Sequence, residues 1–263
     1  MERTSGPLSG TSGSIHKRYK QLENYRSSWR SHWSEISDYL LPRRGRYLIE
    51  SQTTKGRKRS SKIVDSTGGQ ALRTLSAGMM SGMTSPARPW FRLRTEDPEV
   101  MEQQDVKVWL ADVERMIRKL LASSNFYNVA HTTYNELGAF GTSAVLRQSH
   151  PQTTLHYRPF TAGEYVLAEN RFNQVDTVGR EFSMTVSQVV EQFVLNKETG
   201  EPDWTKVSAS VKNMWNRKNY DANISVIHMI QPRRESDIDP ERKDGKSKRF
   251  MDVYIESGAD NDT

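Results

Sequence analysis

Residues 63–93, IVDSTGGQALRTLSAGMMSGMTSPARPWFRL, are the most informative stretch of the sequence. Asp65, Ser66 and Thr67 are good helix N-caps, because their side-chain oxygens can accept hydrogen bonds from the free N–H groups of a first turn. Apolar residues then recur every three to four positions, which is typical of one face of a helix: Ala71, Leu72, Leu75, Met79 and Met83. Pro86 and Pro89 end this helix, since proline lacks an N–H and disfavours helical geometry in the preceding residue.

The residues around this helix predict how it packs. Trp90 and Phe91 follow the second proline at once and should anchor the end of the helix in a core. We therefore expect residues 65–93 to hold the main core, with these side chains buried: Leu72, Leu75, Met79, Trp90 and Phe91. Gly78 and Gly82 lie four residues apart beside the apolar face, so another helix backbone can approach closely there. The preceding helix is the expected neighbour.

Three further helices are predicted. The first follows an N-terminal tail, residues 1–14, that lacks a signal-peptide core and is expected to be flexible. Its apolar residues form one stripe that ends at Pro42: Ile15, Tyr19, Leu22, Trp29, Trp33, Ile36 and Leu40. The other two span residues 103–123 and 126–140. The expected buried face of the first of these is Val106, Trp109, Leu110, Val113, Ile117, Leu120 and Leu121.

Beyond residue 142 the apolar period changes from 3.6 to two, which predicts strands. They are expected at residues 143–148, 155–159, 165–169, 175–184, 224–230 and 250–255, with adjacent runs paired in an antiparallel meander. Thr185 and Gln188 form a capping box that starts a short helix. The sequence thus predicts an α+β fold: N-terminal amphipathic helices in a helical part, residues 15–142, then an antiparallel β meander with short helices, residues 143–256. A tail, residues 257–263, follows.

The segment between Pro42 and Ile63 is strongly basic. Its cations are Arg43, Arg44, Arg46, Lys55, Arg57, Lys58, Arg59 and Lys62, against one acidic residue, Glu50. This imbalance predicts a local positive potential. The segment could contact DNA phosphates or an acidic neighbouring subunit, whereas a solvated loop without a partner is the alternative.

Composition narrows the possible functions. The 263 residues carry a net charge of +6 and are 35% hydrophobic. They contain no cysteine, and this excludes disulfides and thiolate metal sites. No apolar run approaches the roughly 20 residues that span a bilayer, so no membrane partner is expected. His150 and His156 could meet across a hairpin, but no third ligand accompanies them, so we expect no metal. Acidic residues are scattered rather than clustered, and we expect neither catalysis nor a cofactor.

Several short motifs carry a resemblance to a known family. The run at residues 65–93 resembles the head-to-tail connector (portal) family of short-tailed bacteriophages. Further similar motifs follow in the same order: Ser124-Asn125-Phe126-Tyr127, Gly138-Ala139-Phe140-Gly141-Thr142, Gly163-Glu164-Tyr165, Asp176-Thr177-Val178 and Arg180-Glu181-Phe182. The resemblance covers most of the chain, from about Ile15 to near Tyr254. The number and collinearity of the motifs make the match specific.

The resemblance implies a structural role. Members of the family form dodecameric rings at one vertex of the capsid, through which double-stranded DNA is packaged and ejected and to which the terminase and tail proteins attach. The ring itself performs no hydrolysis and would be found in the virion, and in the host cytoplasm during assembly. This chain would correspond to the α/β wing region and so to an N-terminal fragment, with the channel helices, clip and crown further along.

The residues by themselves leave two other functions open. One is a sequence-nonspecific DNA-binding adaptor that acts as a monomer or dimer. The other is a fragment of an enzyme whose catalytic half lies elsewhere.

Overall fold

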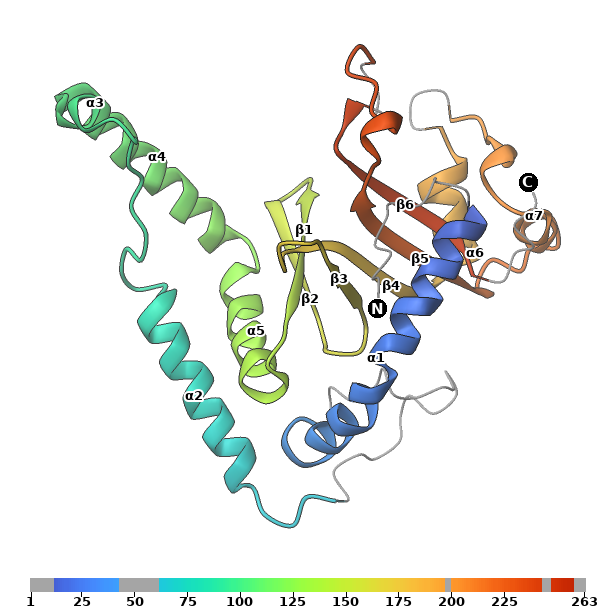
Figure 1. Ribbon diagram of the computed structural model, residues 1–263, viewed down its shortest axis with the longest axis horizontal. Helices are drawn as coiled ribbons and strands as arrows, with labels where there is room; N and C mark the ends of the chain where they lie inside the picture. The colour runs from blue at the N-terminus through green and yellow to red at the C-terminus, as the bar shows by residue number, and fades with distance from the viewer. Residues whose placement is uncertain (1–11, 43–61, 197–199, 243–246, 258–263) are drawn as a thin grey trace. The chain divides into compact units, whose positions relative to one another are not determined.

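The computed structural model describes residues 12–42, 62–196, 200–242 and 247–257. They form an α+β fold of helices and antiparallel strands, as the sequence predicts (Figure 1). The chain divides into two compact units. Residues 29–163 form what we call the helical unit, and residues up to 28 together with those from 164 onward form the sheet unit. The division by residue number into a helical and a β-rich part stays a prediction.

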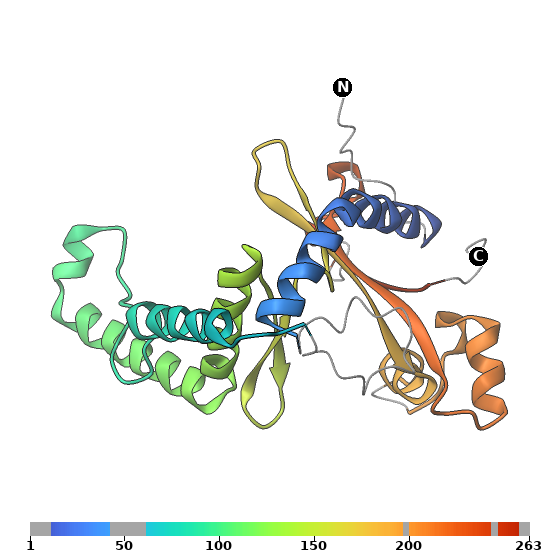
Figure 2. The same ribbon diagram turned by 90° about the horizontal axis from the view of Figure 1, so that it is seen from below.

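The helical unit contains four complete helices and a hairpin within its described residues. α1, Ser12–Leu40, contributes its second half to this unit and ends just before Pro42. The complete elements are α2, Thr67–Met83; α3, Pro98–Glu102; α4, Gln104–Ser123; α5, Phe126–Phe140; β1, Ala144–His150; and β2, Thr154–Phe160. α5 packs against both α2 and β2 (Figure 1). Figure 2 shows α3 at the end of α4 that points away from α5 and the hairpin.

The packing of α2 differs from the prediction in two respects. A Cβ built on Gly78 or Gly82 would meet no described atom within 4 Å, so these glycines do not form the contact with α1. The close approaches lie elsewhere: a Cβ on Gly68 would come within 2.8 Å of Leu40, and one on Gly138 of α5 within 2.9 Å of Leu72. The expected core of residues 65–93 is also only partly formed. Leu72 is buried, Met79, Trp90 and Phe91 are half-buried, and Leu75 is 50% exposed.

α4 begins one residue after its predicted start and ends where predicted, but much of its apolar face is uncovered. Leu110 and Leu121 are buried against the rest of the unit. Trp109 is 63% exposed and Leu120 38% exposed, so the expectation that both are buried is wrong. The remaining apolar residues of the expected face are half-buried: Val106, Val113 and Ile117. The periodicity identified the apolar side of the helix correctly, but within the described residues no element covers all of it.

The first half of α1 and the elements that follow β2 form the sheet unit. Its strands are β3, Val166–Glu169; β4, Val175–Thr185; β5, Asn223–Pro232; and β6, Phe250–Glu256, paired antiparallel in the order β3-β4-β5-β6. Its helices are α6, Val186–Val189, which continues as a π-helical turn, Val190–Val194, and α7, Ala209–Asn216. The predicted capping box of Thr185 and Gln188 is present. The predicted strands therefore form two sheets, a hairpin and a four-stranded meander, rather than one.

Helices cover both faces of the four-stranded sheet. On one face, Ile15 and Tyr19 of α1 pack with Ile227 and Met229 of β5. On the other face, α6 and α7 pack on Ile224 and Val226 of the same strand. Neighbouring residues of β5 thus point to opposite cores, as the two-residue period of a strand requires. In Figure 1 the first half of α1 runs along the sheet that contains β5 and β6.

Candidate interaction site

The basic residues predicted as a contact site lie mostly outside the described part of the chain. These are Arg43, Arg44, Arg46, Lys55, Arg57, Lys58 and Arg59, and nothing in the structure tests their role. Lys62 is described and exposed, and its Nζ lies 2.6 Å from Oδ2 of Asp38 in α1. The hydrogen bond and charge of Asp38 raise the pKa of Lys62 above its ordinary value. This lysine is therefore already engaged with a carboxylate, whereas the other seven residues stay candidates.

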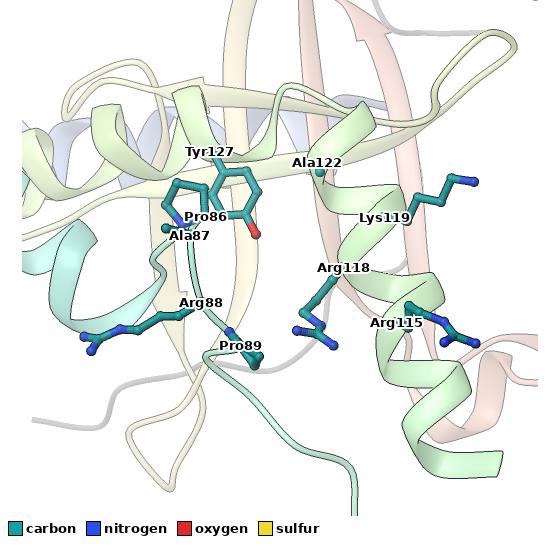
Figure 3. A pocket seen from close by; sticks show the side chains of 9 residues that line it. All are labelled: Pro86, Ala87, Arg88, Pro89, Arg115, Arg118, Lys119, Ala122 and Tyr127. Carbon is teal, nitrogen blue, oxygen red and sulfur yellow. The ribbon is translucent and has the colours of Figure 1, made fainter. Parts of the chain in front are cut away.

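A different cluster of cations surrounds a cleft in the helical unit, which we call the basic pocket. The cleft has a volume of about 370 Å³ and lies between α4 and the loop that follows α2 (Figure 3). Its lining residues are Pro86, Ala87, Arg88, Pro89, Arg115, Arg118, Lys119, Ala122 and Tyr127. Pro86 and Pro89 follow the end of α2 at Met83 and prevent the helix from continuing, and the loop turns at residues 86–87. The pocket thus combines apolar walls with four basic side chains.

Arg118 is the central cation of the basic pocket. Figure 3 shows its side chain extending from α4 toward the loop that carries Pro89, whereas Arg115 and Lys119 extend from the other side of the helix. The Nε atom of Arg118 is buried and has no hydrogen-bond partner among the described residues. Burying an N–H of a charged group without a partner costs free energy, about 1–3 kcal/mol or more.

The other cations around the pocket differ in their engagement. Arg115 forms an ion pair with Asp112, with Nη2 2.6 Å from Oδ1. Arg88 donates to the backbone carbonyl of Ser81 at 3.0 Å. Lys119 is exposed. The pocket therefore keeps a net positive potential and is suited to a carboxylate or a phosphate.

An aromatic junction holds the pocket in place. Phe126 stacks on Trp90, with ring centroids 5.9 Å apart, and the indole N–H of Trp90 donates to the hydroxyl of Tyr127 at 3.4 Å. Asn125 makes two hydrogen bonds with the backbone of Tyr157 in β2, accepting from N at 2.8 Å and donating to O at 2.7 Å. The motifs 89–91 and 124–127 therefore meet in space and join α4, α5 and the hairpin.

The basic pocket was not predicted from the sequence. Nothing in the sequence indicates that Arg88 lies near Arg115, Arg118 and Lys119 of α4. Arg118 is half-buried and extends toward the loop, whereas Arg115 and Lys119 are exposed (Figure 3). The signal present in the sequence was the spacing of the three α4 cations, three and four residues apart, which puts them on neighbouring positions of one helix. The loop partner is fixed by the tertiary structure alone.

The histidines do not form a metal site in the described residues. The rings of His150 and His156 lie 5.8 Å apart across the β1–β2 hairpin. His150 Nδ1 accepts a hydrogen bond from the backbone N–H of Thr153 at 3.2 Å, so it stabilises the turn. Within the described part of the chain no group of three or more potential ligands lies together. None of the helices described is long and apolar enough to cross a membrane.

A buried polar network in the sheet unit resembles a catalytic dyad, but its geometry argues against that role. His228 is buried, and its Nε2 lies 2.7 Å from Asp252 Oδ1. Nδ1 accepts a hydrogen bond from Nε of Arg180 at 3.3 Å, so Nε2 carries the proton and donates to Asp252. A general base needs a free lone pair on the histidine. Here Arg180 occupies that lone pair, and the network ties β4, β5 and β6 together.

Comparison with known proteins identifies the family. A family model described as bacteriophage head to tail connecting protein matches residues 12–263. The chain is 44% identical over 243 residues to a protein named "Probable portal protein" of Bordetella phage BPP-1. It is 42% identical over 246 residues to a protein named "Portal protein" of Salmonella phage epsilon15.

The two alignments cover 92% and 94% of this chain but 42% of each relative, so the chain spans less than half the length of the proteins it matches. The motifs that carry the resemblance lie within the matched region. Because the family model extends over nearly the whole chain, the chain belongs to the bacteriophage head-to-tail connecting protein family.

Proposed function

We propose that this chain is part of the subunit of a phage portal ring, a structural connector through which DNA is packaged and ejected. The observation that carries the proposal is the alignment of more than nine-tenths of the chain with two proteins named as portal proteins. The α+β fold, with helices before an antiparallel meander, agrees with the wing-like region that the resemblance implies. The role is structural and non-enzymatic.

The partners follow from this role. Copies of the same protein would form the ring, a dodecamer by resemblance, at one vertex of the capsid. The terminase and the tail proteins would attach to it, and double-stranded DNA would pass through it. The protein would reside in the virion, and in the host cytoplasm during assembly.

Electron microscopy of the whole protein that contains this chain tests the proposal. We expect negatively stained particles to be closed rings with a central channel. A preparation that contains only monomers or dimers and binds DNA would contradict it and favour the DNA-binding adaptor.

The basic segment, residues 43–62, is proposed to contact DNA phosphates or an acidic neighbour. If it contacts DNA, replacing Arg57, Lys58 and Arg59 together by alanine should flatten the dependence of log K on log salt by up to about 3, because fewer counterions are released on binding. Fluorescence anisotropy with a duplex at several salt concentrations measures this slope.

A matched control removes three cations of the sheet unit, Lys206, Lys212 and Arg217. This triple alanine variant should keep the wild-type slope. An unchanged slope in the Arg57, Lys58 and Arg59 variant would exclude DNA contact by these residues and leave the acidic neighbour or the solvated loop.

A further inference from the structure

The end of α4 farthest from the basic pocket is acidic. Residues 94–105 contain five carboxylates against one cation, Arg94, and we call this segment the acidic tip. Its exposed carboxylates are Glu96, Asp97, Glu99, Glu102 and Asp105. Asp97 caps α3 by accepting hydrogen bonds from the N–H groups of Glu99 and Val100. Among the described residues, Glu102 alone of the five forms an ion pair, with Lys107 at 2.8 Å.

The acidic tip cannot neutralise the basic pocket of its own copy. Asp105 and Lys119 both lie on α4, where a rise of 1.5 Å per residue separates them by about 21 Å along the helix axis. The Debye length at physiological ionic strength is about 8 Å, so the two charged regions hardly interact within one chain. Both therefore stay available to charges on another molecule.

Apolar side chains accompany both charged regions. Val108 is 51% exposed and Trp109 63% exposed in the first turns of α4, directly after the acidic tip. The walls of the basic pocket include Pro86, Pro89 and Tyr127. Exposed aromatic residues and arginines placed in apolar pockets are the residue types that dominate protein interfaces.

We propose that copies of this protein contact each other through these two regions, with the acidic tip of one copy in the basic pocket of the next. The proposal rests on the proposed role as a ring subunit and names a contact that holds the ring. Because the two surfaces differ, an open row of copies keeps one unused tip at one end and one unused pocket at the other, and the contact repeats until the ring closes. Carboxylates of the incoming tip would pair with the guanidinium of Arg118 and the ammonium of Lys119, both of which line the pocket.

The surroundings of the pocket favour a protein over a nucleic acid as its binding partner. A DNA backbone would satisfy Arg118 and Lys119, but it would not bury the exposed Trp109 and Val108 of the same helix. It would also leave Glu96, Asp97, Glu99 and Asp105 of the acidic tip without a cation. A second copy of this chain accounts for both regions at once.

Charge reversal in the whole protein tests the contact. A pocket variant carries Arg118→Glu and Lys119→Glu, and a tip variant carries Glu96→Lys and Glu99→Lys, which leaves the cap Asp97 and the ion-paired Glu102 intact. Each variant alone loses the charge complementarity of the contact, because two of the four pocket cations or two of the five tip carboxylates are reversed, and we expect its association to weaken at least tenfold. An equimolar mixture pairs each reversed pocket with a reversed tip and should restore rings of alternating copies.

Two controls separate a lost contact from lost folding. The variant with all four substitutions should form rings again, which a misfolded protein could not do. Reversing Lys212 and Arg217 of the sheet unit by glutamate changes the charge equally and should leave ring formation unchanged. Native mass spectrometry and negative-stain images give the number of copies in each case.

Other outcomes would contradict the proposed contact in different ways. Rings of both variants at wild-type strength would refute the contact and leave the ring role standing. A mixture that stops at dimers would show a two-fold pairing instead of a repeating one. Loss of DNA binding by the pocket variant, with rings intact, would assign the pocket to nucleic acid. Absence of rings in the wild-type protein would refute the proposed function itself.

Discussion

Asn125 gives a physical meaning to one of the motifs that carry the family resemblance. Its amide pairs with both backbone groups of Tyr157, as a neighbouring strand residue would, and so ties the start of α5 to β2. Phe126, the next residue, stacks on Trp90. The motif therefore joins α5, β2 and the loop that carries Trp90. An amide side chain and an aromatic ring are the residue types that these contacts require.

Replacing Asn125 by alanine should lower the free energy of unfolding by about 1–3 kcal/mol, since Tyr157 then loses two partners. Asn125→Asp should cost about as much at neutral pH, because a second acceptor oxygen replaces the amide that donates to the Tyr157 carbonyl. Urea denaturation measures both variants.

Asn128 offers a control on the exposed side of α5. Its replacement by alanine should change stability by no more than about 0.5 kcal/mol. Stability of Asn125→Asp equal to the wild type would show that the donated bond to Tyr157 contributes nothing.

Glu181 is a carboxylate whose stabilising effect depends on pH. Burial opposes its ionisation, but hydrogen bonds from Ser257 and Ser225 and the charge of Lys20 outweigh that, so its pKa lies below the ordinary value of 4.5. Ser225 Oγ donates to Oε1 at 2.7 Å, and Lys20 Nζ lies 3.2 Å from Oε2. Glu181 thereby links α1, β4 and β5.

A carboxylate whose pKa is lower in the folded than in the unfolded state stabilises the fold. The stabilisation is fully present when the pH is above the unfolded-state pKa, and it is lost as the pH falls through the folded-state pKa. Glu181→Gln should therefore cost about 1–2 kcal/mol at pH 7, and the difference from the wild type should shrink below about pH 4. Urea denaturation across this pH range provides the measurement. Glu191→Gln, at an exposed position, should show no such pattern, and a pH-independent loss for Glu181→Gln would contradict the linkage.

At the scale of elements, α2 shows that an apolar residue on the predicted buried face of a helix can still be exposed. Leu72 and Leu75 belong to the same apolar stripe, yet Leu72 is 6% exposed and Leu75 is 50% exposed. Leu72→Ala should destabilise the helical unit by about 2–5 kcal/mol, because it leaves a cavity against α5. Leu75→Ala should cost about 1 kcal/mol, since half of that side chain already faces solvent. Thermal melts of the two variants make the comparison, and equal losses would place Leu75 in a core after all.

The bounds of many elements could be predicted from local signals. α5 begins and ends where expected. Its end at Phe140 follows from Gly141, which adopts the left-handed conformation, φ 70°, that terminates the helix. The capping box at Thr185 and Gln188 likewise starts α6. α3 was missed, although Asp97 followed by Pro98 is a cap followed by the residue type favoured at a first helical position.

Tertiary features could not be predicted in the same way. The period of α4 shows which side is apolar, but Trp109 is exposed because no described element packs on it. The separation of β1 and β2 from the other strands depends on pairing partners, which the two-residue period does not specify. The basic pocket depends on bringing Arg88 next to Arg118. Counting charges found the segment at residues 43–62 but could not find this pocket.

At the scale of the whole molecule, the 263-residue chain on its own should not form a closed ring. Its relatives are more than twice as long as the region they share with it, so contacts made by the rest of a subunit are missing. Exposed side chains such as Trp109 and Met116 should make it self-associate without a defined size. We expect sedimentation velocity to show a monomer or a broad distribution. One sharp species at the mass of a closed ring would contradict this.

The sheet unit is assembled from two stretches of chain with the helical unit inserted between them, and this has a consequence for synthesis on the ribosome. Arg18 of α1 donates a hydrogen bond to Thr177, 159 residues later, and β6 comes later still. At about 5–20 residues per second, α1 emerges roughly ten to fifty seconds before the last strand of its sheet. Its apolar residues Ile15 and Tyr19 lack Ile227 and Met229 of β5 for most of that interval. The helical unit can fold first. To avoid aggregation, the exposed apolar face of α1 then needs either a chaperone or rapid synthesis of the remaining strands.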